Sequence, residues 1–400
     1  MAPVAAYVIP AREYALVFGT AVVVTFVLTG LVRLLAVRVG AVTPIRDRDV
    51  HSLPIPRMGG VAVYLGFAGA VLMALQLPAL SAAFRASSEI VGVLVAGAVI
   101  CLVGVLDDRF DLDAVAKLAG QILAAGVLVL FGVQWQSLWL PDSDTGGQVV
   151  FLDQTQGVVL TILLTVILTN AMNFIDGLDG LLAGVAAISA LALFVFSTRQ
   201  LFLSGNDTYA SQPPLMAAAL VGACIGFLPH NFWPARIFMG DSGAMFIGLA
   251  MAAATVSANG RLDTSTFGPR STIALLAPLV VALAVVFIPV LDFLMAVIRR
   301  TKEGRHPFSA DKQHLHHRML AIGHTQRQAV LVFYLWAAIL AGGAVSLAFL
   351  TTDRGIVIAV VAMVVLLIAA AGLSVWPRIR ARRVQRRSPG ADSPPERIAA

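Results

Sequence analysis

Charged residues are scarce in this chain. Asp, Glu, Lys and Arg make up 12% of its 400 residues, whereas hydrophobic residues make up 58%. Soluble globular proteins carry about 25% charged residues. The composition therefore argues against a water-soluble fold and indicates a protein that crosses a membrane several times.

Cysteine is nearly absent as well. Cys101 and Cys224 both lie inside apolar runs, where we expect them to be small buried apolar residues. Neither a disulfide framework nor a cysteine-based metal site is expected. The net charge of +6 requires no nucleic acid partner, because membrane proteins collect Lys and Arg in their cytoplasmic loops.

Eleven apolar runs are candidate membrane spans, although several are shorter than the roughly 20 residues per helix that the hydrocarbon core of a bilayer requires. We predict an all-α polytopic fold, with one transmembrane catalytic domain over residues 1–376 and a basic, largely disordered tail over 377–400. The first run is too long for the core of a signal peptide and is expected to remain uncleaved. The predicted spans are 14–37, 58–80, 89–106, 114–132, 157–174, 178–197, 213–229, 243–258, 271–298, 328–351 and 355–376.

Basic residues are distributed unequally between the two sides. If the N-terminus lies outside, the inner loops and the tail receive most of the Lys and Arg residues. The positive-inside rule therefore predicts an outer N-terminus and a cytoplasmic C-terminus. The longest outer loop, 133–156, is predicted to form a small hairpin over the outer surface.

The most informative stretch is residues 173–180, which read NFIDGLDG between two apolar runs. Asp176 and Asp179 are three residues apart and can share one face of a helical turn. Carboxylates beside hydrocarbon commonly pair, bind cations or handle protons, although Asp179 can also be read as the cap of the next helix. With Asn173 at the same boundary, this stretch is predicted to be the edge of an active site.

Two more inner loops present carboxylates at helix ends. Asp107 and Asp108 follow the span 89–106, and Asp241 begins the span after the loop that contains Asn231 and Phe238. Adjacent carboxylates repel one another unless a cation compensates. Mg²⁺ prefers oxygen ligands and commonly bridges to substrate phosphates. We therefore predict a Mg²⁺ site, with Mn²⁺ as an alternative ion.

Cations are expected to face these acids. Arg57 lies on a rigid loop rich in Pro and Gly, where it is either an inner-surface anchor or a phosphate contact. Lys117, inside the span 114–132, either extends to the interface or contacts a phosphate. The last inner loop carries a basic cluster of Arg305, His314, His316, His317 and Arg318. These histidines could alternatively be ligands of a zinc ion, but no nearby cysteine completes such a site. We therefore favour a cluster that contacts phosphate or handles protons.

Acids on three inner loops and cations on a fourth describe one site at the cytoplasmic membrane surface. Carboxylates that bind Mg²⁺, phosphate-binding cations and adjacent hydrocarbon suit phosphoryl transfer from a water-soluble nucleotide to a lipid. Catalysis of this kind rests mostly on positioning and charge neutralisation.

In this order, the motifs resemble those of the polyprenyl-phosphate N-acetylhexosamine-1-phosphate transferases, a family that includes phospho-N-acetylmuramoyl-pentapeptide transferase. The resemblance covers residues 54–318. It is carried by PRxGG at 56–60, DD at 107–108, NxxDGxDG at 173–180, FMGDxG at 238–243 and HxHHR at 314–318.

The resemblance implies an enzyme of the plasma (inner) membrane in which a polyprenyl phosphate attacks the β-phosphorus of a UDP-sugar. The products would be a polyprenyl-diphospho-sugar and UMP, and a homodimer would be compatible with the family. Asp241 would bind Mg²⁺, whereas Asp107 and Asp108 would bind metal or activate the lipid phosphate. Asp176, Asp179, His314, His316 and His317 would be catalytic or lie near the diphosphate. The implied substrate-binding residues are Arg57, Asn173, Gly177, Leu178, Asp179, Asn231, Phe238, Arg305 and Arg318.

Two branches of this family differ in the sugar. The pentapeptide branch usually has three consecutive histidines, and lysines after the acidic pair. This chain has HLHH at 314–317 and RFD at 109–111 instead. Both departures resemble the N-acetylglucosamine-1-phosphate branch, which starts cell-envelope glycopolymers such as teichoic acids, arabinogalactan linkers or O-antigens, so UDP-GlcNAc is the expected donor. The pentapeptide transferase remains an alternative. A multi-span transporter is the rival class, disfavoured because the acids, with Asp292 as the main exception, lie at span ends rather than in mid-membrane.

Overall fold

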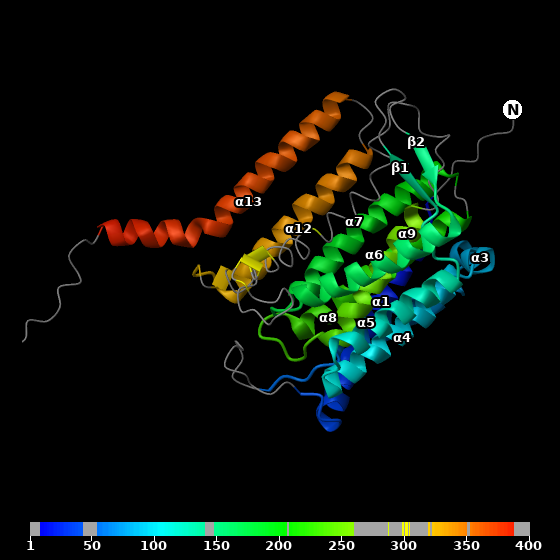
Figure 1. Ribbon diagram of the computed structural model, residues 1–400, viewed down its shortest axis with the longest axis horizontal. Coiled ribbons are helices and arrows are strands. Elements are labelled where there is room, and N and C mark those ends of the chain that lie inside the picture. Colours follow the sequence, from blue (N-terminus) through cyan, green and yellow to red (C-terminus); the bar gives the residue numbers. More distant parts are fainter. Residues whose placement is uncertain are drawn as a thin grey trace, which may run out of the picture.

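A computed structural model of the chain is a bundle of long helices (Figure 1). It describes residues 9–42, 54–140, 148–205, 208–259, 322–349 and 353–387, together with 287, 298–299, 301–302, 304 and 319–320. The helices are α1 Ala11–Arg38, α2 Gly59–Ala74, α3 Pro78–Ala86, α4 Glu89–Phe110, α5 Ala114–Leu130, α6 Gln154–Ile175, α7 Leu181–Leu203, α8 Gln212–Asn231, α9 Gly240–Asn259, α12 Gln326–Phe349 and α13 Asp353–Arg387.

Eight of the helices in the described ranges are long and apolar enough to cross a membrane. Counting the bent pair α2 and α3 as one broken span adds a ninth, and α5 is an apolar helix of 17 residues. This confirms the prediction of an all-α polytopic membrane protein. Of the eleven predicted spans, 271–298 lies almost wholly outside the described residues, and every other span overlaps a helix of the bundle.

The predicted span 58–80 is interrupted in the structure. α2 ends at Ala74, and α3 starts at Pro78 in a direction turned by 101°. Pro has no backbone N–H and is favoured in the first turn of a helix, so Pro78 starts a new helix more readily than it continues the old one. α3 packs against the short 3₁₀ helix η1, Thr208–Ser211, and Gln212 donates a hydrogen bond to the carbonyl of Ala83 over 2.9 Å.

α9 lies at the centre of the bundle and is almost entirely buried. It packs against α4 and α6. α4 runs antiparallel to it, because Glu89 at the start of α4 accepts a hydrogen bond from Ser257 near the end of α9, while Asp108 near the end of α4 contacts Ser242 at the start of α9. The ends of α4 and α9 that carry the predicted acidic residues therefore meet.

Glycine permits this close approach of α4 and α9. A Cβ placed on Gly104 would collide with the backbone of Ser242. At the same end of α9, a Cβ on Gly60 of α2 would collide with the backbone of Gly243. The start of α9 is thus enclosed by backbone from two other helices, without intervening side chains.

The predicted hairpin in the loop 133–156 is present. β1, Ser137–Leu140, pairs antiparallel with β2, Gln148–Phe151, with Ser137 opposite Phe151. The hairpin lies at the same end of the bundle as α3 (Figure 1). After it, Asp153 and Gln156 form a capping box that starts α6.

The C-terminal helices lie on one side of the bundle. α12 packs on α7, and α13 packs on α12 (Figure 1). α13 continues to Arg387, so the predicted boundary between the transmembrane domain and the tail at residue 377 falls inside a helix, and the first part of the predicted tail is helical. Residues 388–400 lie outside the described part of the chain.

The contact of α4 with α9 predicts a difference between two glycines. Gly104→Ala should lower the free energy of unfolding by about 1–3 kcal/mol, because the added methyl group separates the two helices. Gly126→Ala in α5 is the matched control, since a Cβ there meets no atom within 4 Å and alanine favours helix formation. Thermal unfolding of both variants in detergent measures the difference. Equal midpoints would contradict the prediction.

Candidate active site

Carboxylates from two helices meet where α4 ends and α9 begins. Asp107 and Asp108 lie in the last turn of α4, and Asp241 lies in the first turn of α9. The side chains of Asp107 and Asp241 are within hydrogen-bonding distance of each other. The structure therefore brings together all three residues that were predicted to bind a divalent cation.

Asp108 caps the start of α9. Its Oδ1 accepts from the backbone N–H of Asp241 at 3.0 Å, and its Oδ2 accepts from the N–H and the hydroxyl of Ser242 at 3.2 and 2.9 Å. The first N–H groups of a helix have no partner within the helix and carry partial positive charge, so a carboxylate stabilises them. Gly240, at φ +73, makes the turn that exposes these groups, and a side chain there would collide with Asp108. In this structure, Asp108 orients Asp241.

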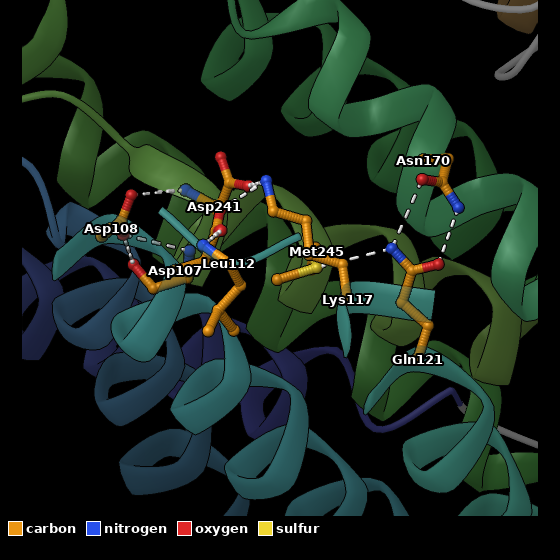
Figure 2. A network of polar contacts seen from close by, with 9 residues as sticks. Asp107, Asp108, Leu112, Lys117, Gln121, Asn170, Asp241 and Met245 are labelled. Carbon is orange, nitrogen blue, oxygen red and sulfur yellow. Dashed lines mark hydrogen bonds and ion pairs between the residues drawn. The ribbon is translucent and has the colours of Figure 1, made fainter. Parts of the chain in front are cut away.

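A lysine ammonium lies between the other two carboxylates (Figure 2). Lys117 Nζ is 2.6 Å from Asp107 Oδ2 and 2.8 Å from Asp241 Oδ2. The second oxygen of Asp107 accepts from the backbone N–H of Leu112 at 2.8 Å. The lysine comes from the first turn of α5, which Asp113 starts by accepting from the N–H of Ala116. Lys117 pairs here with Asp107 and Asp241, a contact that neither sequence interpretation gave, and its contact with a phosphate stays a prediction.

A column of polar groups continues from Lys117 along α5 (Figure 2). One turn after the lysine, buried Gln121 exchanges two amide hydrogen bonds with Asn170 of α6, at 2.7 and 3.4 Å. The Gln121 amide also lies 3.6 Å from the sulfur of Met245 in α9. This amide pair joins α5 to α6 and fixes the rotation of α5 about its axis, and with it the direction of Lys117.

The end of α6 supplies Asn173 and Asp176 on the same face as Asn170. Asn173 is within hydrogen-bonding reach of Asp241, and Asp176 accepts from the N–H of Gly240. Burial raises the pKa of the Asp176 carboxyl to about 8, and the negative charges of Asp241 and Asp108 add to this effect. The Gly240 N–H and the charge of Arg57 act in the opposite direction. Asp176 therefore belongs to the same electrostatic cluster as the carboxylates of α4 and α9.

The loop that carries Arg57 pairs with the loop before α9 and forms a backbone ladder between residues 56–60 and 238–239. Phe238 N–H donates to the Pro56 carbonyl at 2.9 Å, Gly59 N–H donates to the Phe238 carbonyl at 3.0 Å, and Gly60 N–H donates to the Met239 carbonyl at 2.9 Å. Met58 takes the left-handed conformation, φ 75, within this ladder. The sequence motifs at 56–60 and 238–243 thus form one structural unit.

Asp179 and Asn231 connect two other loops and are almost fully buried. Asp179 accepts from the N–H of Ala235 at 2.8 Å. Asn231 accepts from the N–H of Gly180 and donates to the carbonyl of Ile237, both at 3.0 Å. These contacts hold residues 179–180 against residues 231–237. The predicted roles of both residues toward a substrate stay predictions.

The remaining predicted residues divide into two groups. Gly177 is exposed and Leu178 is buried beside Asp179, so both lie on the loop that Asn231 holds in place. Arg305, His314, His316, His317 and Arg318 lie outside the described residues. Sequence reasoning did not single out Ser242 and Gln121, although Gln121 is four residues after Lys117 and therefore on the same helical face.

The carboxylate pair of Asp107 and Asp241 is the part of this cluster that suits a divalent cation. No group of three His, Cys, Asp or Glu side chains within the described ranges has the arrangement of a complete metal site. Mg²⁺, however, is usually bound by only one or two carboxylates, with substrate phosphates and water completing its octahedron. Two carboxylates that already enclose a positive charge fit that donor set.

Comparisons with known proteins agree with the motifs. Residues 90–259 match the family described as glycosyl transferase family 4. The chain is 52% identical over 341 residues to a Mycobacterium tuberculosis protein named decaprenyl-phosphate N-acetylglucosaminephosphotransferase, covering 85% of this chain and 84% of the relative. It is 30% identical over 319 residues to the probable undecaprenyl-phosphate N-acetylglucosaminyl 1-phosphate transferase of Bacillus subtilis, covering 80% of each. It is 31% identical over 316 residues to the Escherichia coli K12 undecaprenyl-phosphate alpha-N-acetylglucosaminyl 1-phosphate transferase, covering 77% of each.

The loop contacts of Asn231 predict a loss of stability when its side chain is shortened. Asn231→Ala leaves the Gly180 N–H and the Ile237 carbonyl unpaired and buried, at a cost of about 1–3 kcal/mol for each group. Asn231→Asp retains an acceptor for Gly180 but places a buried carboxylate against the Ile237 carbonyl, so both variants should be less stable than the parent. Unfolding midpoints in detergent test this prediction. An Ala variant as stable as the parent would show that these loops are held by other contacts.

Proposed function

The chain belongs to glycosyl transferase family 4, in the branch that transfers N-acetylglucosamine 1-phosphate to polyprenyl phosphate, and on this basis we propose UDP-GlcNAc as its donor and Mg²⁺ as its cation. Relatives at about 50% identity carry decaprenyl in their names, whereas those at about 30% carry undecaprenyl. Decaprenyl phosphate is therefore the acceptor that we propose. A cell-wall glycopolymer such as arabinogalactan is the proposed destination of the product.

The observation that carries this proposal is the pairing of Asp107 with Asp241 around a positive charge, at the ends of two apolar helices. This position places cation-binding oxygens beside hydrocarbon, where a lipid phosphate and a water-soluble nucleotide can both reach. Mg²⁺ bound there would neutralise the charge that develops on the diphosphate as the bond to UMP breaks. Asp107 and Asp241 would hold the ion, and Asp108 would keep Asp241 in position.

In the proposed reaction, an oxygen of the lipid phosphate forms a bond to the β-phosphorus of UDP-GlcNAc. The bond from that phosphorus to the oxygen bridging the two phosphates breaks, and its electrons leave with UMP. The attacking phosphate needs no general base, because a phosphate monoester has a second pKa near 6 and is already largely ionised at neutral pH. The work of the protein is therefore to position the two phosphates and to neutralise their repulsion.

We further propose that the N-terminus lies outside, that the carboxylate cluster faces the cytoplasm of the cell, and that the membrane is the plasma membrane. Most Lys and Arg residues then lie on the inner side, and the site meets cytoplasmic nucleotide-sugars. The eleven spans counted in the sequence and a homodimer belong to the same proposal.

Transfer is tested with membranes that contain the protein, decaprenyl phosphate, Mg²⁺ and radiolabelled UDP-GlcNAc, with labelled UDP-MurNAc-pentapeptide in a parallel reaction. We expect label in the lipid phase only from UDP-GlcNAc. Asp241→Asn should reduce the transfer by about a hundredfold or more, since it removes a charge that would hold the cation.

Asp111→Asn is the matched control for this assay. It removes an exposed carboxylate from the same end of α4, and asparagine tolerates the left-handed conformation, φ 55, that residue 111 adopts. Its activity should match the parent. Transfer from the pentapeptide donor would contradict the proposed sugar. If the folded protein transferred label from neither donor, the proposed transferase activity would be wrong.

Orientation is tested with single introduced cysteines. The native Cys101 and Cys224 are buried, so the background of thiol labelling should be low. A membrane-impermeant maleimide should label Ser204→Cys in intact cells, and should label Ala114→Cys only after the membrane is broken. Both positions are exposed. The opposite labelling pattern would reverse the proposed topology.

A further inference from the structure

Lys117 pairs with both of the carboxylates that are proposed to hold the divalent cation. Its ammonium contacts the Oδ2 atoms of Asp107 and Asp241, at 2.6 and 2.8 Å, and the side chains of the three residues are 29%, 5% and 20% exposed respectively. Limited access to water strengthens ion pairs relative to those on an open surface. This lysine is therefore a tightly held counter-charge rather than a side chain extended into solvent.

The other oxygens of the acidic pair on α4 already have partners. Asp107 Oδ1 accepts from Leu112, and both oxygens of Asp108 accept from the start of α9. The Oδ2 atoms of Asp107 and Asp241 are thus the ones directed toward a cation. Mg²⁺ binds oxygen at about 2.0–2.1 Å. An ion held by Asp107 and Asp241 would compete with the ammonium for these carboxylates, so the lysine and the ion exclude each other.

Two contacts keep Lys117 aimed at this position. Asp113 caps the start of α5 one turn before it, and the Gln121 pair with Asn170 fixes the helix one turn after it. The backbone of residue 117 is therefore set, and only the side chain can move. A lysine side chain has four rotatable bonds, so its ammonium can leave the carboxylates without any movement of the backbone.

We propose that Lys117 regulates metal binding by ion exchange. Without substrate, its ammonium neutralises Asp107 and Asp241 and weakens the affinity of the site for a free divalent ion. When the ion arrives with the donor, the ammonium moves from the carboxylates to a phosphoryl oxygen, so the metal binds mainly together with the nucleotide. This inference rests on the cation site of the proposed function, but it assigns a role that metal binding alone can test.

Mn²⁺ binding to the purified protein in nanodiscs, followed by the loss of the free Mn²⁺ signal in electron paramagnetic resonance, is the direct test. Lys117→Met removes the charge and keeps the length of the side chain. Without nucleotide, this variant should bind Mn²⁺ more tightly than the parent by about tenfold or more, because a competing cation has been removed. Adding UDP-GlcNAc should tighten Mn²⁺ binding strongly in the parent and only weakly in the variant. Transfer activity should fall in Lys117→Met.

Three comparisons make the result specific. Lys117→Arg keeps the charge and should bind Mn²⁺ about as weakly as the parent. Arg109→Met removes a positive charge from the exposed end of α4, where Arg109 lies over the ring of Phe110, and should change the affinity little. Lys117→Gln, a second neutral variant, provides the same readout if Lys117→Met does not fold, as judged by its unfolding midpoint.

Mn²⁺ binding that is equal or weaker in the neutral variants would overturn the inference. Equal binding would mean that the lysine does not compete with the ion, and weaker binding would mean that it supports the site. These measurements distinguish a failure of the exchange role from a failure of the proposed transferase function. If the parent transfers GlcNAc 1-phosphate but the neutral variants bind Mn²⁺ as the parent does, only the exchange role is lost. If the parent binds Mn²⁺ but transfers nothing, the function is lost.

Discussion

The rest of the site depends on the capping of α9 by Asp108. One carboxylate on α4 accepts three hydrogen bonds from the first turn of α9, and such bonds to a helix start are stabilised by the partial positive charge there. The contact requires Gly104, because a side chain at that position would hold the two helices apart. With α9 fixed in this way, Asp241 faces Asp107, and Gly240 presents its N–H to Asp176. The three acidic motifs thus converge through backbone geometry as much as through their own charges.

Two layers of polar contacts surround this cluster. Close to the carboxylates, Lys117 balances two negative charges that would otherwise repel each other in a partly buried site. Farther out, Gln121 with Asn170, and Asn231 with its two loops, hold the elements that carry the site. Each of these outer amides is hydrogen-bonded, as buried polar groups must be to avoid a large desolvation cost. The membrane enzyme therefore uses amides inside its bundle to align charged groups at the ends of its helices.

Much of this architecture could be predicted from the sequence, because apolar runs, glycines and acidic motifs are local signals. The apolar runs correctly predicted the location of ten helices, and the turn-rich segment 133–156 correctly predicted the hairpin. The positions of Asp107, Asp108 and Asp241 at helix ends indicated a common site. The break at Pro78 was missed because hydropathy continues across it. The capping role of Asp108 and the bridging by Lys117 depend on which helices touch, which no local pattern in a single sequence specifies. The predicted roles of the histidine cluster remain predictions.

The backbone ladder between residues 56–60 and 238–239 constrains how this enzyme can diverge. Its hydrogen bonds join two segments that are far apart in the chain and meet in a fixed register. A single inserted or deleted residue in either segment would shift every later partner by one position and would turn Arg57 or Asp241 away from the site. Such a change is tolerable only if the other segment changes in length at the same time. The lengths of the two loops should therefore change only together. Length variation among related chains should accumulate in the hairpin and in the C-terminal helix instead.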